Sequence, residues 1–143
     1  MTSIKKRVLL VTGFNYFPQS VGGAESSTHE LCRILQNNQF EVAVLAALAP
    51  QKDIIHYKNR LLHKLTGRYA PADKFASYQV YRGWDSVEGL AEVKQRFKPD
   101  LVVVQSGQPA KLVNASINLG LTTILYIRDV AFDTHGGKYT KND

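Results

Sequence analysis

The chain has 143 residues, of which 44% are hydrophobic and 21% are charged, and it carries a formal net charge of +6. This length fits one domain, and the composition is that of a folded globular protein rather than a disordered one. The single cysteine, Cys32, excludes an intramolecular disulfide, and the four scattered histidines give no zinc-binding spacing. The positive charge directs attention to anionic partners: phosphates, nucleic acids or an anionic membrane surface.

The N-terminus carries only a brief likeness to a targeting signal. The apolar run Val8-Leu9-Leu10-Val11 follows three basic residues, but it ends at Thr12-Gly13, too early for a signal peptide. No stretch approaches the roughly 20 apolar residues of a membrane span. We therefore expect a cytoplasmic protein, with peripheral attachment to the inner face of the membrane as an open alternative.

Short runs that are apolar on both faces mark the expected strands. Such runs are typical of parallel strands that helices cover from both sides. They lie at residues 8–11, 40–48, 78–84, 101–104 and 122–127. A long turn-rich loop follows the first of these strands and ends at Gly23.

Helical periodicity fills the intervals between the expected strands. One helix begins at Ala24, and another follows Asp85 or Ser86 as its N-cap. A further helix begins at Pro109 and ends at Gly120, which suit its first turn and its C-cap. We expect the buried side of that helix to consist of Leu112, Ala115, Ile117 and Leu119.

This element order predicts an α/β fold, a Rossmann-like, open and mostly parallel sheet with helices on both faces. In such sheets, ligands bind beyond the carboxyl ends of the strands. Three segments therefore become candidates for a functional site: residues 12–23, residues 105–108, and residues 128–143, for which no element is predicted.

The loop that ends in Gly22-Gly23 gives the clearest chemical signal. Paired glycines before a helix let the backbone approach a ligand, and a helix N-terminus attracts an anion such as a diphosphate. A turn that needs positive φ is the alternative interpretation. The chain lacks both the G-x-x-x-x-G-K-[ST] and the G-x-G-x-x-G motif, and no acidic residue ends the second strand. A nicotinamide-dependent dehydrogenase is therefore disfavoured.

The other two segments supply polar candidates. Arg128-Asp129 ends the last expected strand, where the guanidinium suits a phosphate and the carboxylate suits a sugar hydroxyl; an ordinary ion pair is the alternative. Ser106 lacks the motif of a hydrolase nucleophile, and His135 is an isolated loop histidine. We retain both as acceptor-side candidates rather than as catalytic groups.

Together, these motifs resemble the N-terminal domain of family 4 (group 1) glycosyltransferases, the retaining enzymes of the GT-B fold. The most specific match is F-P-x-x-x-G-G-A-E, which spans residues 17–25. The K-P-D sequence at residues 98–100 and the strand that ends in Arg128-Asp129 also match. The resemblance covers most of residues 6–130 and leaves residues 50–77 unmatched.

The resemblance implies an enzyme that transfers a sugar from a UDP- or GDP-sugar to an acceptor such as a glycan or a lipid-linked sugar. Residues 1–143 would be its acceptor-side domain, truncated and inactive alone, without the donor domain that carries the family's E-x7-E motif. Gly22 and Gly23 would reach the donor diphosphate, with Arg128 and Asp129 lining the cleft, and neither metal nor cofactor is expected. The family commonly has histidine where Arg128 stands; arginine cannot titrate near neutral pH, which favours a clamp on charge over a proton shuttle.

The unmatched segment concentrates positive charge. Apolar residues cluster on one side of its helical wheel, namely Ile54, Ile55, Leu61, Leu62 and Leu65. A single carboxylate, Asp53, accompanies five basic residues: Lys52, Lys58, Arg60, Lys64 and Arg68. A basic amphipathic helix of this kind can lie on an anionic membrane, and many members of the resembled family use lipid-linked acceptors. The alternative is a solvated helix that packs on the edge of the sheet.

A second class of function stays open. The short chain also fits a non-catalytic binding module, or a half-enzyme that needs a separate partner subunit. Binding to nucleic acid is not expected, because no aromatic-basic RNA motif and no recognition-helix pattern accompanies the net charge.

Overall fold

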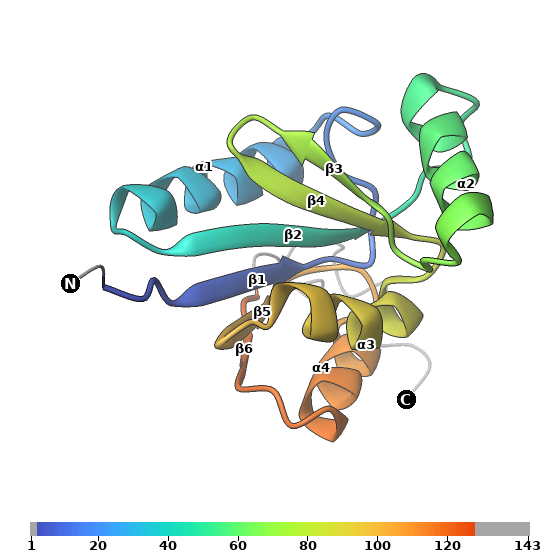
Figure 1. Ribbon diagram of the computed structural model, residues 1–143. Coiled ribbons are helices and arrows are strands. Elements are labelled where there is room, and N and C mark those ends of the chain that lie inside the picture. Colours follow the sequence, from blue (N-terminus) through green and yellow to red (C-terminus); the bar gives the residue numbers. More distant parts are fainter. Residues whose placement is uncertain (1–2, 128–143) are drawn as a thin grey trace, which may run out of the picture.

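The computed structural model describes residues 3–127, and the structural statements that follow concern this part of the chain (Figure 1). Strands and helices alternate along it. Their bounds are β1 (Arg7–Val11), α1 (Gly23–Asn37), β2 (Glu41–Ala47), α2 (Ile54–Thr66), β3 (Ala72–Phe75), β4 (Tyr78–Gly83), α3 (Ser86–Phe97), β5 (Leu101–Val104), α4 (Pro109–Asn118) and β6 (Thr123–Leu125).

The strands form one sheet in the order β3-β4-β2-β1-β5-β6. All neighbouring pairs are parallel except β3 and β4, which are antiparallel. The predicted α/β, Rossmann-like and mostly parallel sheet is therefore confirmed. β3 was not predicted, because its sequence Ala-Asp-Lys-Phe lacks the continuous apolar run of the other strands. An edge strand tolerates such polar residues because one side of it faces solvent.

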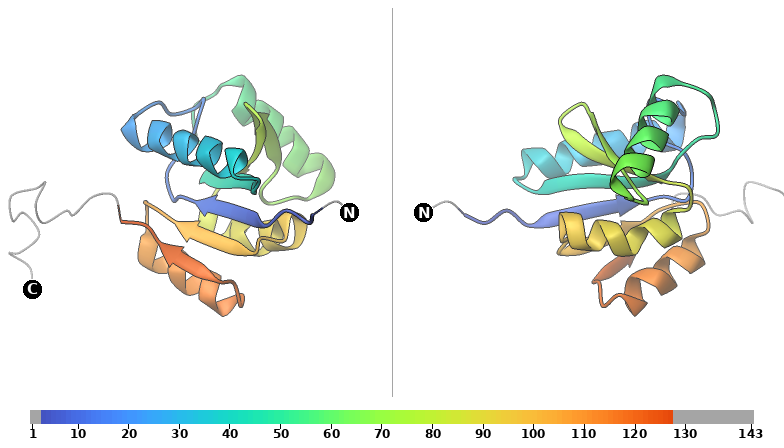
Figure 2. Two further views of the ribbon diagram at one scale, coloured as in Figure 1. Left: turned by 90° about the vertical axis from the view of Figure 1, so that its left-hand side faces the viewer. Right: turned by 45° about the vertical axis from the view of Figure 1, so that its right-hand side comes forward.

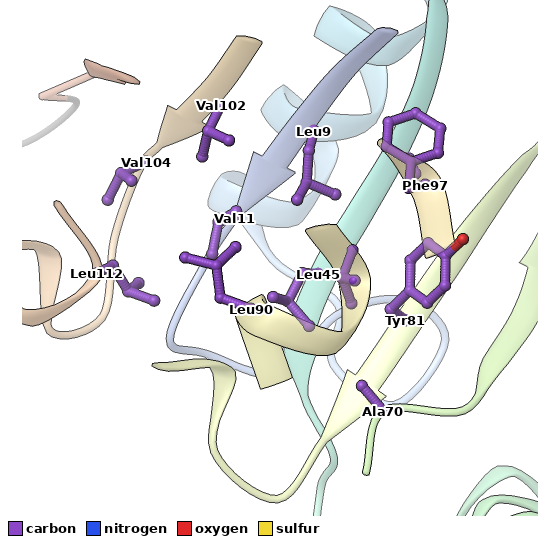
Figure 3. Packing of buried hydrophobic residues seen from close by; sticks show 12 residues of the cluster. Leu9, Val11, Leu45, Ala70, Tyr81, Leu90, Phe97, Val102, Val104 and Leu112 are labelled. Carbon is purple, nitrogen blue, oxygen red and sulfur yellow. The ribbon is translucent and has the colours of Figure 1, made fainter. Parts of the chain in front are cut away.

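Two apolar cores lie on opposite faces of the sheet. Alternate residues of a strand point to opposite faces, so Leu9 and Val11 join one core while Val8 and Leu10 join the other. The first core packs under α3 and α4 (Figure 3), and the second packs under α1. Figure 2 shows α1 on one side of the sheet and α3 and α4 on the other. Each fully buried leucine or valine contributes roughly 1.5–3 kcal/mol.

The first turns of α3 and α4 follow the predicted signals, whereas α4 ends at Asn118 with Leu119 as its C-cap, and Gly120, the predicted C-cap, follows it with φ +73°. Asp85 caps α3 by accepting a hydrogen bond from the backbone nitrogen of Val87 at 2.8 Å, and Pro109 stands in the first turn of α4. One expected core position in α4 is wrong, because Ile117 is exposed. The buried positions of α4 are Leu112 and Ser116, one helical turn apart, and the Ser116 hydroxyl lies 2.6 Å from that of Thr123.

The orientation of α2 also differs from the interpretation of a helix that packs its apolar side on the sheet edge. The buried residues of α2 are His56 and Asn59, whereas Ile54, Leu61 and Leu65 are exposed. Ile55 and Leu62 are half-buried, so only part of the apolar side is turned outward. Nδ1 of His56 lies 3.0 Å from the carbonyl oxygen of Ala49, just after β2, and this contact holds the polar buried residues inward. Within residues 3–127, no helix is long and apolar enough to cross a membrane.

Candidate functional site

The strand order places a crevice at the carboxyl ends of β1 and β5. β1 is followed by α1 on one face of the sheet, and β5 is followed by α4 on the other. The chain therefore leaves these two neighbouring strands in opposite directions, and ligands bind at such points in open α/β sheets. The segments that meet there are Thr12-Gly13 after β1 and Gln105-Ser106-Gly107 after β5.

These two segments cross at very short range. The Gly13 backbone nitrogen donates to the Ser106 carbonyl oxygen at 2.7 Å, and the Thr12 hydroxyl lies 3.3 Å from the Ser106 hydroxyl. A Cβ on Gly13 would lie 2.1 Å from the Gly107 carbonyl oxygen, and Gly107 itself has φ +66°. Both positions therefore require glycine for a reason internal to the fold. The sequence analysis did not pair these glycines, because they are far apart in the chain.

Gly22 and Gly23 differ from that pair. Gly22 is the N-cap of α1 with φ −169°, an extended backbone that any residue adopts, and Gly23 is the first residue of the helix. The turn of positive φ that was the alternative interpretation is therefore absent from both positions of the described chain. A Cβ on Gly23 would meet no described atom within 4 Å. The fold thus gives no steric reason for glycine at position 23, which leaves the helix N-terminus open to close approach.

A small hollow joins the α1 N-terminus to the loop crossing. Its enclosed volume of about 10 Å³ is room for about one water, so a larger ligand would lie across its mouth. Residues from both elements line it: Thr12, Phe14, Asn15, Tyr16, Ala24, Glu25, Thr28 and Ser106. The structure therefore brings Ser106 and the first turn of α1 to one place, although Gly22 and Gly23 themselves do not line the hollow.

The Glu25 carboxylate already stands at the N-terminus of α1. One of its oxygens accepts a hydrogen bond from the Ser20 hydroxyl at 3.2 Å, and the other would lie 2.8 Å from a Cβ on Gly22. A carboxylate in the first turn is stabilised by the helix dipole. An anion that binds at this helix N-terminus would lie close to the Glu25 carboxylate. The two negative charges would repel each other, so the carboxylate weakens the binding of an anionic ligand or has to move away.

Gln105 is a polar residue that the sequence analysis did not single out. Its side chain is buried, with 5% of the residue exposed, directly after β5. Its Oε1 accepts a hydrogen bond from the Thr28 hydroxyl at 2.9 Å, but Nε2 has no partner among the described residues. A buried amide donor without a partner is costly, but Nε2 is itself buried and Gln105 does not line the hollow, so a ligand reaches it only after a local rearrangement. A polar residue that ends an apolar strand was the available signal.

The loop before α1 is held in place by Arg82 of β4. This fully buried side chain forms an ion pair with Asp73, with Nε 2.5 Å from Oδ1 and Nη2 3.1 Å from Oδ2. It also donates to the carbonyl oxygens of Tyr16 and Phe17. A buried guanidinium needs all of these acceptors. The loop therefore has to keep the conformation that presents its carbonyl oxygens to Arg82, and Arg82 stabilises that conformation.

A hydroxyl network supports the same loop from the other side. The Tyr16 and Tyr78 hydroxyls lie 2.7 Å apart, and Nδ1 of His29 lies 2.8 Å from the Tyr78 hydroxyl. Phe17 stacks on Phe75 with ring centroids 5.3 Å apart. Burial, and then the bond with Tyr16, raise the pKa of Tyr78, so this phenol stays neutral and acts as a structural group.

Gln19 joins the loop to α2 through Asp53, and this link predicts a pH effect. Asp53 accepts from the backbone nitrogen of His56 at 2.7 Å and from Nε2 of Gln19 at 3.1 Å, and the first of these bonds is the main cause of its lowered pKa. A lowered pKa stabilises the fold above the unfolded value, about 3.9, and this stability is lost as pH falls through the folded value. We expect Asp53→Asn, which still caps α2, to unfold more easily by up to about 1 kcal/mol at neutral pH and to match the parent at a pH below the folded pKa of Asp53.

Urea denaturation at both pH values measures this difference. A gap between Asp53→Asn and the parent that stays constant across the range would contradict a role for the charge.

The remaining predicted residues stand apart from this hollow or outside the structure. Arg128, Asp129 and His135 lie outside the described residues, so their assignments stay predictions. The basic residues at 52, 58, 60, 64 and 68 belong to α2 and its two ends. The described part of the chain holds no group of three or more His, Cys, Asp or Glu side chains that suits a metal ion.

A larger hollow lies at the opposite edge of the sheet, near the amino ends of the strands. It has about 820 Å³, and its lining includes Arg7, Glu41 and Arg96. Two of its cations already have partners, since Arg7 pairs with Glu41 at 3.0 Å and Arg96 lies 3.7 Å from Glu92. Lys5 and Arg68 also line this hollow. The carboxyl edge is favoured because ligands bind there in open α/β sheets, although its hollow is smaller.

Comparisons of the chain with protein-family models, with curated proteins and with solved structures gave no match.

Proposed function

We propose that the chain is the acceptor-side, N-terminal domain of a retaining glycosyltransferase of the GT-B type. The enzyme would transfer a sugar from a UDP- or GDP-sugar to a glycan or a lipid-linked sugar. One observation carries the proposal: glycine stands at position 23, in the first turn of α1 at the carboxyl edge, although a side chain there would meet no described atom within 4 Å. Since the fold itself gives no steric reason for glycine at this position, we infer that glycine is there to let a ligand approach the backbone closely.

The chemistry of sugar transfer fits this edge. As the bond to the sugar breaks, negative charge develops on the leaving diphosphate, and oriented backbone N–H groups at a helix N-terminus stabilise it. The hydroxyl of Ser106, which lines the hollow, supplies a further donor at the neighbouring strand end. In this proposal, Arg128 and Asp129 contribute a phosphate contact and a hydroxyl contact from the following segment.

The direct test is calorimetric titration of the chain with UDP and with GDP. We expect binding to one of them, and we expect Gly23→Val to weaken it by about tenfold or more, because methyl groups would stand where the phosphates approach. The melting temperature of Gly23→Val serves as the folding control, since the position is sterically open. No binding of either nucleotide, or equal affinity in Gly23→Val, would overturn the proposal.

A second variant tests the electrostatics of the same place. We expect Glu25→Gln to bind the nucleoside diphosphate several-fold more tightly than the parent, because it removes a like charge beside Gly22. The gain should shrink as salt rises. Glu30→Gln, on the same helix, is the matched control and should leave affinity unchanged, because Glu30 forms an ion pair with exposed Arg33. Weaker binding in Glu25→Gln would mean that the carboxylate assists the ligand.

A further inference from the structure

One face of α2 combines exposed apolar and basic side chains. Ile54, Tyr57, Leu61 and Leu65 are between 54% and 85% exposed. Their spacing of three and four residues places them on a single stripe of a helix with about 3.6 residues per turn. The stripe runs the length of a thirteen-residue helix, which is about 20 Å. Four large apolar groups in one exposed row are unusual for a surface helix and indicate a binding face.

The helix is fixed with this stripe outward. His56 and Asn59, on the opposite side, are buried, and the His56 ring also lies 5.6 Å from the ring of Trp84 in an edge-to-face arrangement. Asp53 caps the first turn, and Gly67 closes the last with φ +68°. Rotation of α2 to hide the apolar row would expose these inward contacts, so the row is a built feature of the surface.

The charge on this face has one sign. Lys58 and Lys64 fall on the same face as the apolar row by helical spacing, and all three of Lys58, Arg60 and Lys64 are exposed. The single carboxylate of residues 52–68 is Asp53, which is engaged with the His56 nitrogen and with Gln19. A partner for this face therefore has to offer apolar material together with negative charge.

Trp84 extends the face beyond the helix. Its ring is 45% exposed and lines a groove of about 500 Å³ with Tyr57, Arg60, Leu61, His63 and Lys64. Tryptophan and tyrosine prefer the interface between acyl chains and headgroups, where one part of the ring is dry and another is wet. Lysine places its stem along apolar surface and its charge among headgroups in the same way.

We propose that this α2 face, made of Ile54, Tyr57, Lys58, Leu61, Lys64, Leu65 and Trp84, docks on an anionic lipid surface with the helix axis in the plane of the interface. Charge decides between this partner and a second copy of the chain. A two-fold dimer through the face would place Lys58 and Lys64 of each copy near their equivalents, without carboxylates to neutralise them. Anionic headgroups supply that negative charge over acyl chains that accept the apolar row.

Vesicle binding of the full chain tests the proposal, with Trp84 as the sole tryptophan and hence the reporter. We expect co-sedimentation with phosphatidylcholine vesicles that contain phosphatidylglycerol, and a blue shift of the Trp84 emission. Pure phosphatidylcholine vesicles should bind at least tenfold more weakly, and salt should weaken binding to the mixed ones. No binding to the mixed vesicles, or equal binding to both, would overturn the proposal.

Two pairs of variants separate insertion from simple adsorption of charge. The double variant Leu61→Ser with Leu65→Ser keeps the charge of the face, and we expect it to reduce vesicle binding at least tenfold. Its control is Ile117→Ser, which replaces an exposed apolar residue of α4, outside the α2 face. Lys58→Glu with Lys64→Glu should lose about tenfold or more, and Lys111→Glu is its control. Parental binding in the leucine variant would refute insertion. A leucine variant that abolishes a dimer seen by sedimentation, without changing vesicle binding, would assign the face to a second copy.

Discussion

Arg82→Met is expected to destabilise the chain by about 3–5 kcal/mol. The substitution leaves the Asp73 carboxylate, whose side chain is 10% exposed, without its guanidinium, and it removes donors from the Tyr16 and Phe17 carbonyl oxygens. A buried charge without its partner costs far more than the net worth of the pair. Equilibrium denaturation with urea measures the decrease in the free energy of unfolding. A variant that does not fold at all would show a still larger decrease of the same kind.

Two further variants show whether this cost comes from the buried site. Arg33→Met removes an exposed arginine that pairs with Glu30 at 3.1 Å, and it should cost less than about 1 kcal/mol. Arg82→Lys keeps the charge but not the planar fork, so its stability should fall between that of the parent and that of Arg82→Met. A cost of Arg82→Met as small as that of Arg33→Met would contradict the anchoring of the loop by Arg82.

The second large effect is expected at the crossing of the loops. Gly13→Ala would place a methyl group 2.1 Å from the Gly107 carbonyl oxygen, and Gly107→Ala would add a Cβ at φ +66° that lies 2.7 Å from backbone atoms of Gly13. Neither neighbour is a flexible side chain, so the two loops have to separate. We expect each substitution to cost about 3 kcal/mol or more, measured by urea denaturation.

Gly23→Ala provides the matched comparison, because the same change at that position meets no described atom within 4 Å. It should be neutral or slightly stabilising, since alanine is a better helix former than glycine. Equal stability of Gly13→Ala and Gly23→Ala would mean that the loops do not cross as closely as described.

The strands could be predicted because β1, β2 and β5 are buried on both faces and therefore read as continuous apolar runs. The starts of α3 and α4 could be predicted for a similar reason, since Asp85, the N-cap of α3, and Pro109, in the first turn of α4, act within their own turn. β3 and the orientation of α2 could not be predicted. β3 depends on pairing with β4, and α2 depends on the inward hydrogen bond of His56, which overrides the apolar periodicity.

In the candidate site, too, local signals could be predicted from the sequence, whereas contacts between distant segments could not. Gly22 and Gly23 were visible because a glycine pair before a helix is a local signal. The close approach of Gly13 to Gly107, the unpartnered amide of Gln105 and the anchoring by Arg82 are contacts between distant segments. A single sequence gives at most a weak signal of such contacts, such as a polar residue at the end of an apolar strand, because glutamine or arginine at a strand end or in a strand has many structural uses.

The central claim is that a nucleoside diphosphate binds at the carboxyl edge of the sheet, beside the N-terminus of α1. Amide chemical shifts of the ¹⁵N-labelled chain, followed during titration with UDP and GDP, test it residue by residue. The account predicts saturable shifts at the amides of Gly13, Gly22, Gly23 and Ser106 and at the side-chain amide of Gln105. Shifts confined to the hollow around Arg7 and Glu41 at the opposite edge, or no saturable shifts, would contradict it.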